Sequence, residues 1–317
     1  MSKLVVHAKI MIDGVSDTPK KDQLISIEDG KIVSIEEYHE TNEEVIHANV
    51  VTPGFFNCHV HIMEPVGFGT DKKFSLMEKA FYTQKHCEDY LHSGVTFIRV
   101  LGTANDYDMQ IRDCIDSGLI QGPHMLCAGR CICMTGGHGW QEGIEADGKD
   151  ACLKAVRTQL RSGVDLIKIM ATGGVMTEGV EPGNAQFTVD EMKVMIEEAH
   201  KAGRKTATHA QGLQGIKNAL YAGVDSIEHG CFLDDECLEL MKEQNTFLVP
   251  TLCAPQCIID KGVENGVAKY AVDKTLKVKD AHVESVKKAY EKGIQIALGT
   301  DAGTPAPCPR GTDPGDW

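Results

Sequence analysis

The sequence predicts an α/β fold in which eight parallel strands alternate with helices as a (β/α)8 TIM-like barrel, preceded by a small N-terminal β-domain. One observation is a junction of helix stop, glycine and short apolar run that occurs six times, with a seventh copy carrying asparagine. A second is the length, because 317 residues accommodate a barrel of ~250 residues and a further small domain. A third is that no Gly-x-Gly-x-x-Gly follows the first strand, which disfavours the alternative of an open doubly wound sheet.

Residues 1–51 make up the predicted β-domain, an incomplete β-sandwich. Its apolar runs are short and are separated by polar residues. Asp-Gly pairs between such runs favour hairpin turns. The expected elements are strands at Leu4–Met11, Leu24–Ile27 and Lys31–Ile35, with turns at Asp13-Gly14 and Asp29-Gly30.

Residues 52–303 make up the predicted barrel, with its first strand around Thr52–Asn57. Glycine and asparagine tolerate the left-handed conformation that ends many helices, so each junction predicts a helix stop followed by a strand. One helix is expected to begin with a capping box, formed by Thr188 and Glu191. The junction residues are Gly94, Gly118, Gly163, Gly203, Gly223, Asn245 and Gly293. Eight strand–helix units of this kind favour a closed barrel.

Composition and charge disfavour several classes of function. The chain has 32 basic and 46 acidic residues, and its net charge of −14 disfavours nucleic acid and anionic membranes as partners. No apolar run reaches the ~20 residues of a membrane span, and the N-terminus lacks the pattern of a signal peptide. The 12 cysteines, without a C-x-x-C pair, are therefore expected to be free thiols in a cytoplasmic protein.

A histidine pair stands at the end of the first barrel strand. Active sites of such barrels lie at the carboxyl ends of the strands. Alternation along a strand places His59 and His61 on one side and Cys58 and Val60 on the other. Two neighbouring imidazoles are a typical pair of metal ligands. On this pair alone, two structural histidines are the alternative.

Four more groups with suitable chemistry stand on later strands. Lys168 lies in an apolar strand, where a lysine is either desolvated or extended toward the barrel mouth. A desolvated amine has a lowered pKa and can add CO2, which gives a carbamate able to bridge two metals. His209, His229 and Asp301 end three of the remaining strands. Together these positions favour a metal centre over isolated structural side chains.

The segments around these residues resemble the metal-binding motifs of the amidohydrolase superfamily. The likeness is strongest to the imidazolonepropionase-related branch, which includes Xaa-Pro and Xaa-Arg dipeptidases. It extends from residue 3 to about residue 303. The segments are Pro53-Gly54-Phe55-Phe56-Asn57-Cys58-His59-Val60-His61, Ile167-Lys168-Ile169-Met170-Ala171-Thr172-Gly173-Gly174, Thr208-His209-Ala210, Ile227-Glu228-His229-Gly230 and Gly299-Thr300-Asp301-Ala302-Gly303.

The resemblance implies a centre of two divalent ions of the zinc type. The implied ligands are His59, His61 and Asp301 for the first ion, His209 and His229 for the second, and carboxylated Lys168 as the bridge. A hydroxide shared by the two ions would attack an amide carbon. Asp301 would take up the proton and return it to the leaving nitrogen.

Two loops are expected to complete the site on the substrate side. His138, in the glycine-rich run 135–139, resembles the family's substrate-side histidine, with a loop histidine facing water as the alternative. Such a histidine can hydrogen-bond a substrate carbonyl or carboxylate. Thr172 and Gly173 follow Lys168 and are expected to offer backbone donors to the substrate.

The sequence departs from the family pattern at its end. Members normally continue past the eighth strand with a helix that closes the barrel and with strands that complete the small domain. Residues 304–317 are rich in proline and glycine and predict an irregular tail, so the final barrel helix and the C-terminal strands are expected to be missing. The outward side of the last strand would then face water, with a loss of stability and activity.

The predicted function is that of a binuclear metal-dependent amidohydrolase that cleaves an amide or peptide C–N bond. The expected partner is a small-molecule substrate, a dipeptide or an N-acyl amino acid, and a homo-oligomer is left open. One alternative is a cyclic-amide hydrolase of the imidazolonepropionase type, whose pocket would not grip a free α-carboxylate. Another is a truncated metal-binding protein without catalysis.

Overall fold

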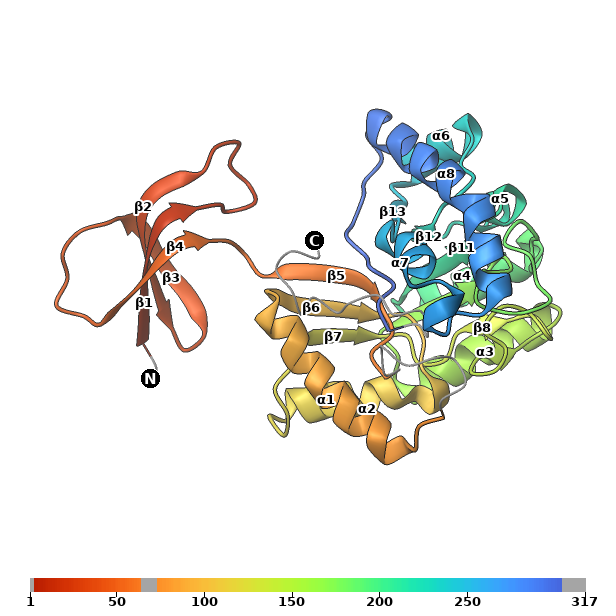
Figure 1. Cartoon of the computed structure of the whole chain (residues 1–317), viewed down its shortest axis with the longest axis horizontal. Coiled ribbons are helices and arrows are strands. Elements are labelled where there is room, and N and C mark those ends of the chain that lie inside the picture. Colours follow the sequence, from red (N-terminus) through yellow and green to blue (C-terminus); the bar gives the residue numbers. More distant parts are fainter. Residues whose placement is uncertain (1–2, 64–72, 304–317) are drawn as a thin grey trace. The chain divides into compact units, whose positions relative to one another are not determined.

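The computed structural model of the protein describes residues 3–63 and 73–303. The chain divides into two compact units, Met1–Phe55 and Phe56–Trp317 (Figure 1). The sequence placed this boundary slightly earlier, after residue 51. The irregular tail expected over residues 304–317 lies outside the described residues.

The N-terminal unit is a four-stranded sheet. Its strands are β1 (Lys3–Met11), β2 (Lys20–Glu28), β3 (Lys31–Glu37) and β4 (Val45–Val51), in the order β3-β2-β1-β4. The turn expected between β2 and β3 is confirmed, because Asp29 and Gly30 both have positive φ, 49° and 77°. β4 was not expected from the sequence, since it pairs in parallel with β1 and no hairpin signal precedes it.

The second unit carries two sheets. Its strands are β5 (Phe55–Val60), β6 (Val95–Val100), β7 (His124–Cys127), β8 (Ile132–Cys133), β9 (Ile144–Glu145), β10 (Leu166–Met170), β11 (Lys205–Ala210), β12 (Ser226–His229) and β13 (Phe247–Val249). One sheet has the order β5-β6-β7 and the other β13-β12-β11-β10-β8-β9. β6 and β7 pair in parallel, as do neighbouring strands throughout the larger sheet. The fold is therefore α/β with parallel sheets, as predicted.

Backbone hydrogen bonds join the edges of these two sheets. On one side, the N–H of Asp165 donates to the carbonyl of Cys127 at 2.8 Å, which links β7 to the start of β10. On the other side, residues 295–302 run between β13 and β5. There the N–H of Ala297 donates to Leu248 at 2.9 Å, and that of Cys58 donates to Leu298 at 2.7 Å. The carboxyl ends of the strands that carry the predicted ligands consequently meet at one end of the unit.

Eight α-helices are described in this unit, and α1 and α2 lie along the β5-β6-β7 sheet (Figure 1). They are α1 (Leu76–His92), α2 (Tyr107–Asp116), α3 (Lys149–Ser162), α4 (Val189–Lys201), α5 (Leu213–Tyr221), α6 (Asp235–Gln244), α7 (Cys253–Lys261) and α8 (Lys269–Glu291). The capping box predicted for Thr188 and Glu191 is present at the start of α4. None of the described helices is both long enough and apolar enough to span a membrane.

The helix stops read from the sequence are confirmed by the backbone. All seven junction residues have positive φ, from 56° at Asn245 to 92° at Gly163. Six of the seven junctions lead to a described strand. The exception is Gly293, after which the expected eighth strand is reduced to isolated bridges of Ile296 with Leu248 and of Ala302 with Val60. Among the six, one strand begins later than expected. Gly122 and Pro123 intervene after the stop at Gly118, and β7 begins only at His124.

The core lies between the strands and the helices that cover them. Fully buried isoleucines of the strands, such as Ile98 and Ile167, belong to one apolar cluster with Met192 and Met195 of α4. Two apolar residues of the last strand segment are partly exposed. Leu298 is 46% exposed and Ile296 is 38% exposed.

Candidate metal centre

All six predicted metal ligands line one cavity of about 470 Å³ at the carboxyl ends of the strands. They come from five places in the chain, namely β5 and the residue after it, β10, β11, β12, and the segment that follows α8. His138 lines the same cavity from the loop between β8 and β9. The ligands are His59, His61, Lys168, His209, His229 and Asp301.

Two histidines of the first strand converge on Asp301. Its Oδ1 lies 3.4 Å from Nε2 of His59 and 3.2 Å from Nε2 of His61. The backbone N–H of Asp301 donates to the carbonyl of His59 at 2.8 Å, which fixes the two strands in register. His59, His229 and Asp301 each offer a ligand atom within 4.8 Å of the others. This spacing is close enough for the three side chains to share a bound ion.

The remaining histidines continue this group across the cavity. The ring centroid of His229 lies 5.1 Å from that of His59 and 4.6 Å from that of His209. The ring of His138 lies 4.4 Å from that of His209. His61 extends the group beyond His59, with ring centroids 5.6 Å apart. Three strand ends and one loop thus bring five imidazoles into a continuous row.

Each strand histidine uses one ring nitrogen for a contact with the protein. Nδ1 of His59 lies 2.9 Å from Oε2 of Glu228, Nδ1 of His61 lies 3.1 Å from the carbonyl of Gly102, and Nε2 of His209 lies 3.0 Å from the carbonyl of Gly173. Carboxylate and carbonyl oxygens only accept, so these nitrogens donate. In the neutral ring the other nitrogen then carries a lone pair, which is the arrangement of metal-binding histidines. The donor set therefore fits divalent ions such as zinc.

Burial keeps these imidazoles neutral. It lowers the pKa of His59, His209 and His229 well below the ordinary histidine value, and it lowers the pKa of His138 to about 4. Burial alone would raise the pKa of Asp301. Interactions with His59, His61 and Lys168, among them a hydrogen bond from His61, more than offset it, so the pKa of Asp301 is lower than usual. Near neutral pH, these groups are thus in the forms that bind metals.

Lys168 is 1% exposed and lies in β10 among wholly buried residues. Burial lowers the pKa of its ammonium to about 8, although Glu228 and Asp301 oppose the change. An amine in this environment is more often neutral than a surface lysine is. The structure therefore places a buried, titratable amine among the five candidate ligands.

Three residues at the strand ends have a strained backbone. His229, Thr251 and Asp301 have φ of 70°, 51° and 56°, in the left-handed region that residues other than glycine seldom adopt. Such conformations cost of order 1–3 kcal/mol each and cluster at functional sites. Nδ1 of His229 lies 2.7 Å from Oγ1 of Thr251, so two of the strained residues hold each other in place.

A buried charge network beneath the cavity was not expected from the sequence. Glu228 is 0% exposed, and its Oε1 accepts from Arg99 Nη2 at 2.7 Å and from Ser226 at 2.6 Å. Its Oε2 faces His59. Arg99 also donates to the carbonyl of Cys58 at 2.6 Å. The available signal was the alternation of Ser226 and Glu228 in a short buried strand, with Arg99 in the apolar strand β6.

Two predicted substrate-side residues do not line the cavity. The hydroxyl of Thr172 is buried and donates to the carbonyl of Gly173 at 2.8 Å. The N–H of Gly173, expected as a donor to substrate, donates to the carbonyl of Asn184 at 3.0 Å. The reason is that the chain after β10 folds back, and Thr172 bridges antiparallel to Ala185. Gly173 instead supports the site through its carbonyl, which accepts from His209.

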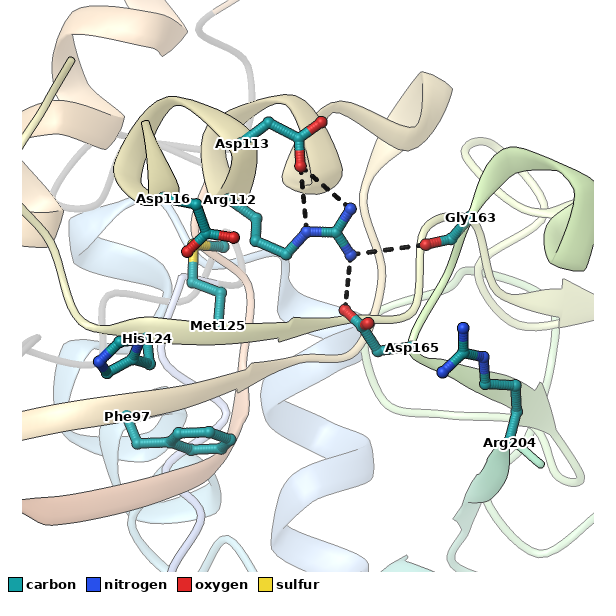
Figure 2. A pocket seen from close by; sticks show the side chains of 9 residues that line it. All are labelled: Phe97, Arg112, Asp113, Asp116, His124, Met125, Gly163, Asp165 and Arg204. Carbon is teal, nitrogen blue, oxygen red and sulfur yellow. Dashed lines mark hydrogen bonds and ion pairs between the residues drawn. The ribbon is translucent and has the colours of Figure 1, made fainter. Parts of the chain in front are cut away.

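A second recess is larger, about 750 Å³, but contains none of these groups (Figure 2). At its wall, Arg112 of α2 donates to Asp165 at 2.7 Å and to Asp113 at 3.1 Å. Asp165 also accepts from the N–H of Cys127 at 2.9 Å. These contacts hold α2 against the β7–β10 junction, so Arg112 and Asp165 have a structural role here.

Comparison with known proteins agrees with this geometry. The profile of the amidohydrolase family matches residues 50–311. An ochratoxinase of Aspergillus niger is 29% identical over an alignment that covers 96% of this chain and 70% of that protein. The crystal structure of a Xaa-Pro dipeptidase with bound methionine in the active site is 33% identical, with a TM-score of 0.89 and coverage of 96% of this chain and 80% of that one. A prolidase complexed with N-methylphosphonate-L-proline is 26% identical, with a TM-score of 0.87 and coverage of 95% and 78%.

Proposed function

The chain belongs to the amidohydrolase family and is a hydrolase of carbon–nitrogen bonds, and from that premise we propose that it cleaves a dipeptide or an N-acyl amino acid at a binuclear metal centre. The observation that carries the proposal is that histidines from several strands line one cavity, each with one ring nitrogen bonded to the protein and the other left as a possible metal ligand. The bonds that join the two sheets support a closed (β/α)8 barrel as the scaffold.

The ligand assignment is the one that the family resemblance implies, and the contacts of Asp301 with His59 and His61 support it. His59, His61 and Asp301 would hold one ion, and His209 and His229 the other. His229, which also lies within reach of His59 and Asp301, stands between the two groups. Lys168, buried in the cavity wall, would bridge the two as a carbamate. Imidazole and carboxylate donors suit zinc, which when bound lowers the pKa of water and polarises a carbonyl group.

The chain's own residues would then divide the reaction. Hydrolysis adds a water oxygen to the amide carbon and breaks the C–N bond, and the leaving nitrogen needs a proton. Asp301, which lies beside His59 and His61, would accept the proton of the water and pass it to that nitrogen. His138, on the other side of the cavity, would hydrogen-bond the substrate through Nε2, since its Nδ1 lies 2.8 Å from Thr177.

The experiment is elemental analysis of the purified chain together with a screen of dipeptides, N-acyl amino acids and cyclic amides. We expect up to two zinc ions per chain and turnover of linear substrates. His59→Ala/His61→Ala and Lys168→Ala should each lose metal, and short carboxylic acids should partly restore it to the lysine variant. Turnover of cyclic amides alone would favour the imidazolonepropionase-type activity. Bound zinc without turnover of any compound would leave a non-catalytic metal protein.

A further inference from the structure

One wall of the cavity is built by a segment that is held from outside the site. Val175, Met176 and Thr177 line the cavity, and Met63 and Met170 stand beside them in the same lining. Methionine is unbranched and polarisable, so it adapts to apolar groups of different shape. The cavity therefore combines its row of histidines with an apolar wall.

Lys274 of α8 holds this segment by its backbone. The residue is only 5% exposed, although lysine is seldom buried unless its charge is satisfied. Its Nζ donates to the carbonyl of Thr177 at 2.7 Å and to that of Val180 at 2.6 Å. Lys277, the next lysine of α8, is exposed instead. Its Nζ lies 3.9 Å from Oε2 of Glu181, and the two form an ion pair at the surface.

Tyr270, one turn earlier in α8, makes a third contact of the same kind. Its hydroxyl donates to the carbonyl of Met176 at 3.1 Å, and its ring lies 5.3 Å from Nζ of Lys274. Val175 and Met176 pack against the apolar cluster between α7 and α8. Three carbonyls of the segment, those of Met176, Thr177 and Val180, are thus anchored to side chains of α8.

The same segment sets the position of His138. Thr177 is 4% exposed, and its Oγ1 lies 2.8 Å from Nδ1 of His138 and accepts from the N–H of Gly139 at 3.3 Å. The ring also lies directly against Gly174, where an added Cβ would come within 2.4 Å of Cε1. A movement of the segment would therefore move the imidazole.

We propose that Lys274 and Tyr270 are positioning residues that clamp residues 175–180 to α8. The clamp fixes the position of His138. It also fixes an apolar wall that selects amides with an apolar side chain. This inference rests on the proposed amide hydrolysis for its kinetic consequences. The clamp itself does not depend on that activity, because its contacts lie within the chain.

The first test measures the clamp without substrate. Hydrogen–deuterium exchange of the zinc-loaded chain should show at least tenfold faster exchange over residues 173–181 in Lys274→Met. Tyr270→Phe, which removes one hydroxyl, should act in the same direction and serves if the lysine variant does not fold. Lys277→Met is the matched control, since an exposed ion pair contributes little. Unchanged exchange in folded Lys274→Met or Tyr270→Phe, or equal acceleration in the control, would overturn the clamp.

The second test is kinetic and uses N-acetyl-L-methionine and N-acetyl-L-glutamate. We expect the kcat/KM of the parent chain to be at least tenfold higher for the methionine compound than for the glutamate compound. The Lys274→Met substitution should lower kcat at least tenfold while the zinc content stays unchanged. In a His138→Ala background, Lys274→Met should change kcat less than twofold, because the two act through one contact. Independent, multiplicative losses would overturn the positioning role, and a preference for glutamate would overturn the apolar wall. If the parent cleaved neither compound, the proposed function would fail while the exchange result would still decide the clamp.

Discussion

Replacement of Glu228 by glutamine tests whether the buried network sets the tautomer of His59. Arg99 and Ser226 both donate to Oε1, at 2.7 and 2.6 Å, so the amide oxygen of the new side chain must take that place. Its NH2 group then faces Nδ1 of His59, which is 2.9 Å from Oε2 in the parent. Two donors cannot share that contact, so the imidazole must move its proton to Nε2. Nε2 is the nitrogen that faces Asp301, and its lone pair would be lost to a metal.

The expected loss follows from that geometry. Removing the partner that orients a ligating histidine lowers metal affinity about 10- to 100-fold. That range corresponds to about 1.4 to 2.8 kcal/mol of binding free energy. Folding should survive, because glutamine keeps the hydrogen bonds with Arg99 and Ser226. Glu228→Leu, by contrast, would leave the half-buried guanidinium of Arg99 without its carboxylate partner and cost about 3–5 kcal/mol of stability.

The assay is competition of the chain against a zinc chelator, with thermal unfolding measured in parallel. Glu236→Gln is the matched control, since Glu236 is exposed on α6 and pairs with Lys217. Its zinc affinity should stay within twofold of the parent. Nitrogen-15 NMR of the histidines should show the Nδ1 proton of His59 in the metal-free parent and not in the metal-free Glu228→Gln variant. Parent-like zinc affinity in a folded Glu228→Gln chain would refute the reasoning.

Three further predictions concern single residues. Asp301→Asn keeps the shape but cannot accept a proton, so turnover should fall by about 10² or more, and near-parental turnover with metal retained would remove Asp301 from this role. Gly174→Ala places a Cβ within 2.4 Å of Cε1 of His138, so the ring must shift and kcat/KM should fall about tenfold at constant metal content; a crystal structure with the ring unmoved would contradict this. Arg112→Met loses its bonds to Asp165 and Asp113, so calorimetry should show a thermal midpoint lower by several degrees with kcat unchanged. A fall in kcat without a fall in midpoint would instead give the recess of Figure 2 a functional role.

Local chemistry explains which features could be predicted. The left-handed backbone that ends a helix favours glycine or asparagine at that residue, and all seven predicted stops have this backbone conformation. Side chains alternate along a strand, so the spacing of His59 and His61 is enough to put both on one side. Lys168 is buried, as one of its two interpretations required.

Features that depend on non-local pairing could not be predicted in the same way. β4 joins β1 in parallel, and nothing in its own seven residues requires that partner. Gly173 was expected to offer a donor because it follows β10. Its N–H is instead taken by Asn184, and this contact exists only because the loop folds back. Arg99 and Glu228 lie 129 residues apart and meet only inside the assembled strands.

The difference between local and non-local features also decides which parts of the site can be tested by mutation. The proposed ligands could be read from the sequence because each stands at or near a strand end, whereas the groups that orient them could not. For His61 and His209 the orienting group is a backbone carbonyl, of Gly102 and Gly173. A side-chain substitution cannot remove a carbonyl, and at these glycines it would add a Cβ that meets His61 or the chain at Glu181. Glu228 is the one orienting acceptor of these three that a substitution can change without altering the backbone. The tautomer of His59 is therefore where the protein's control over the proposed metal centre can be measured directly.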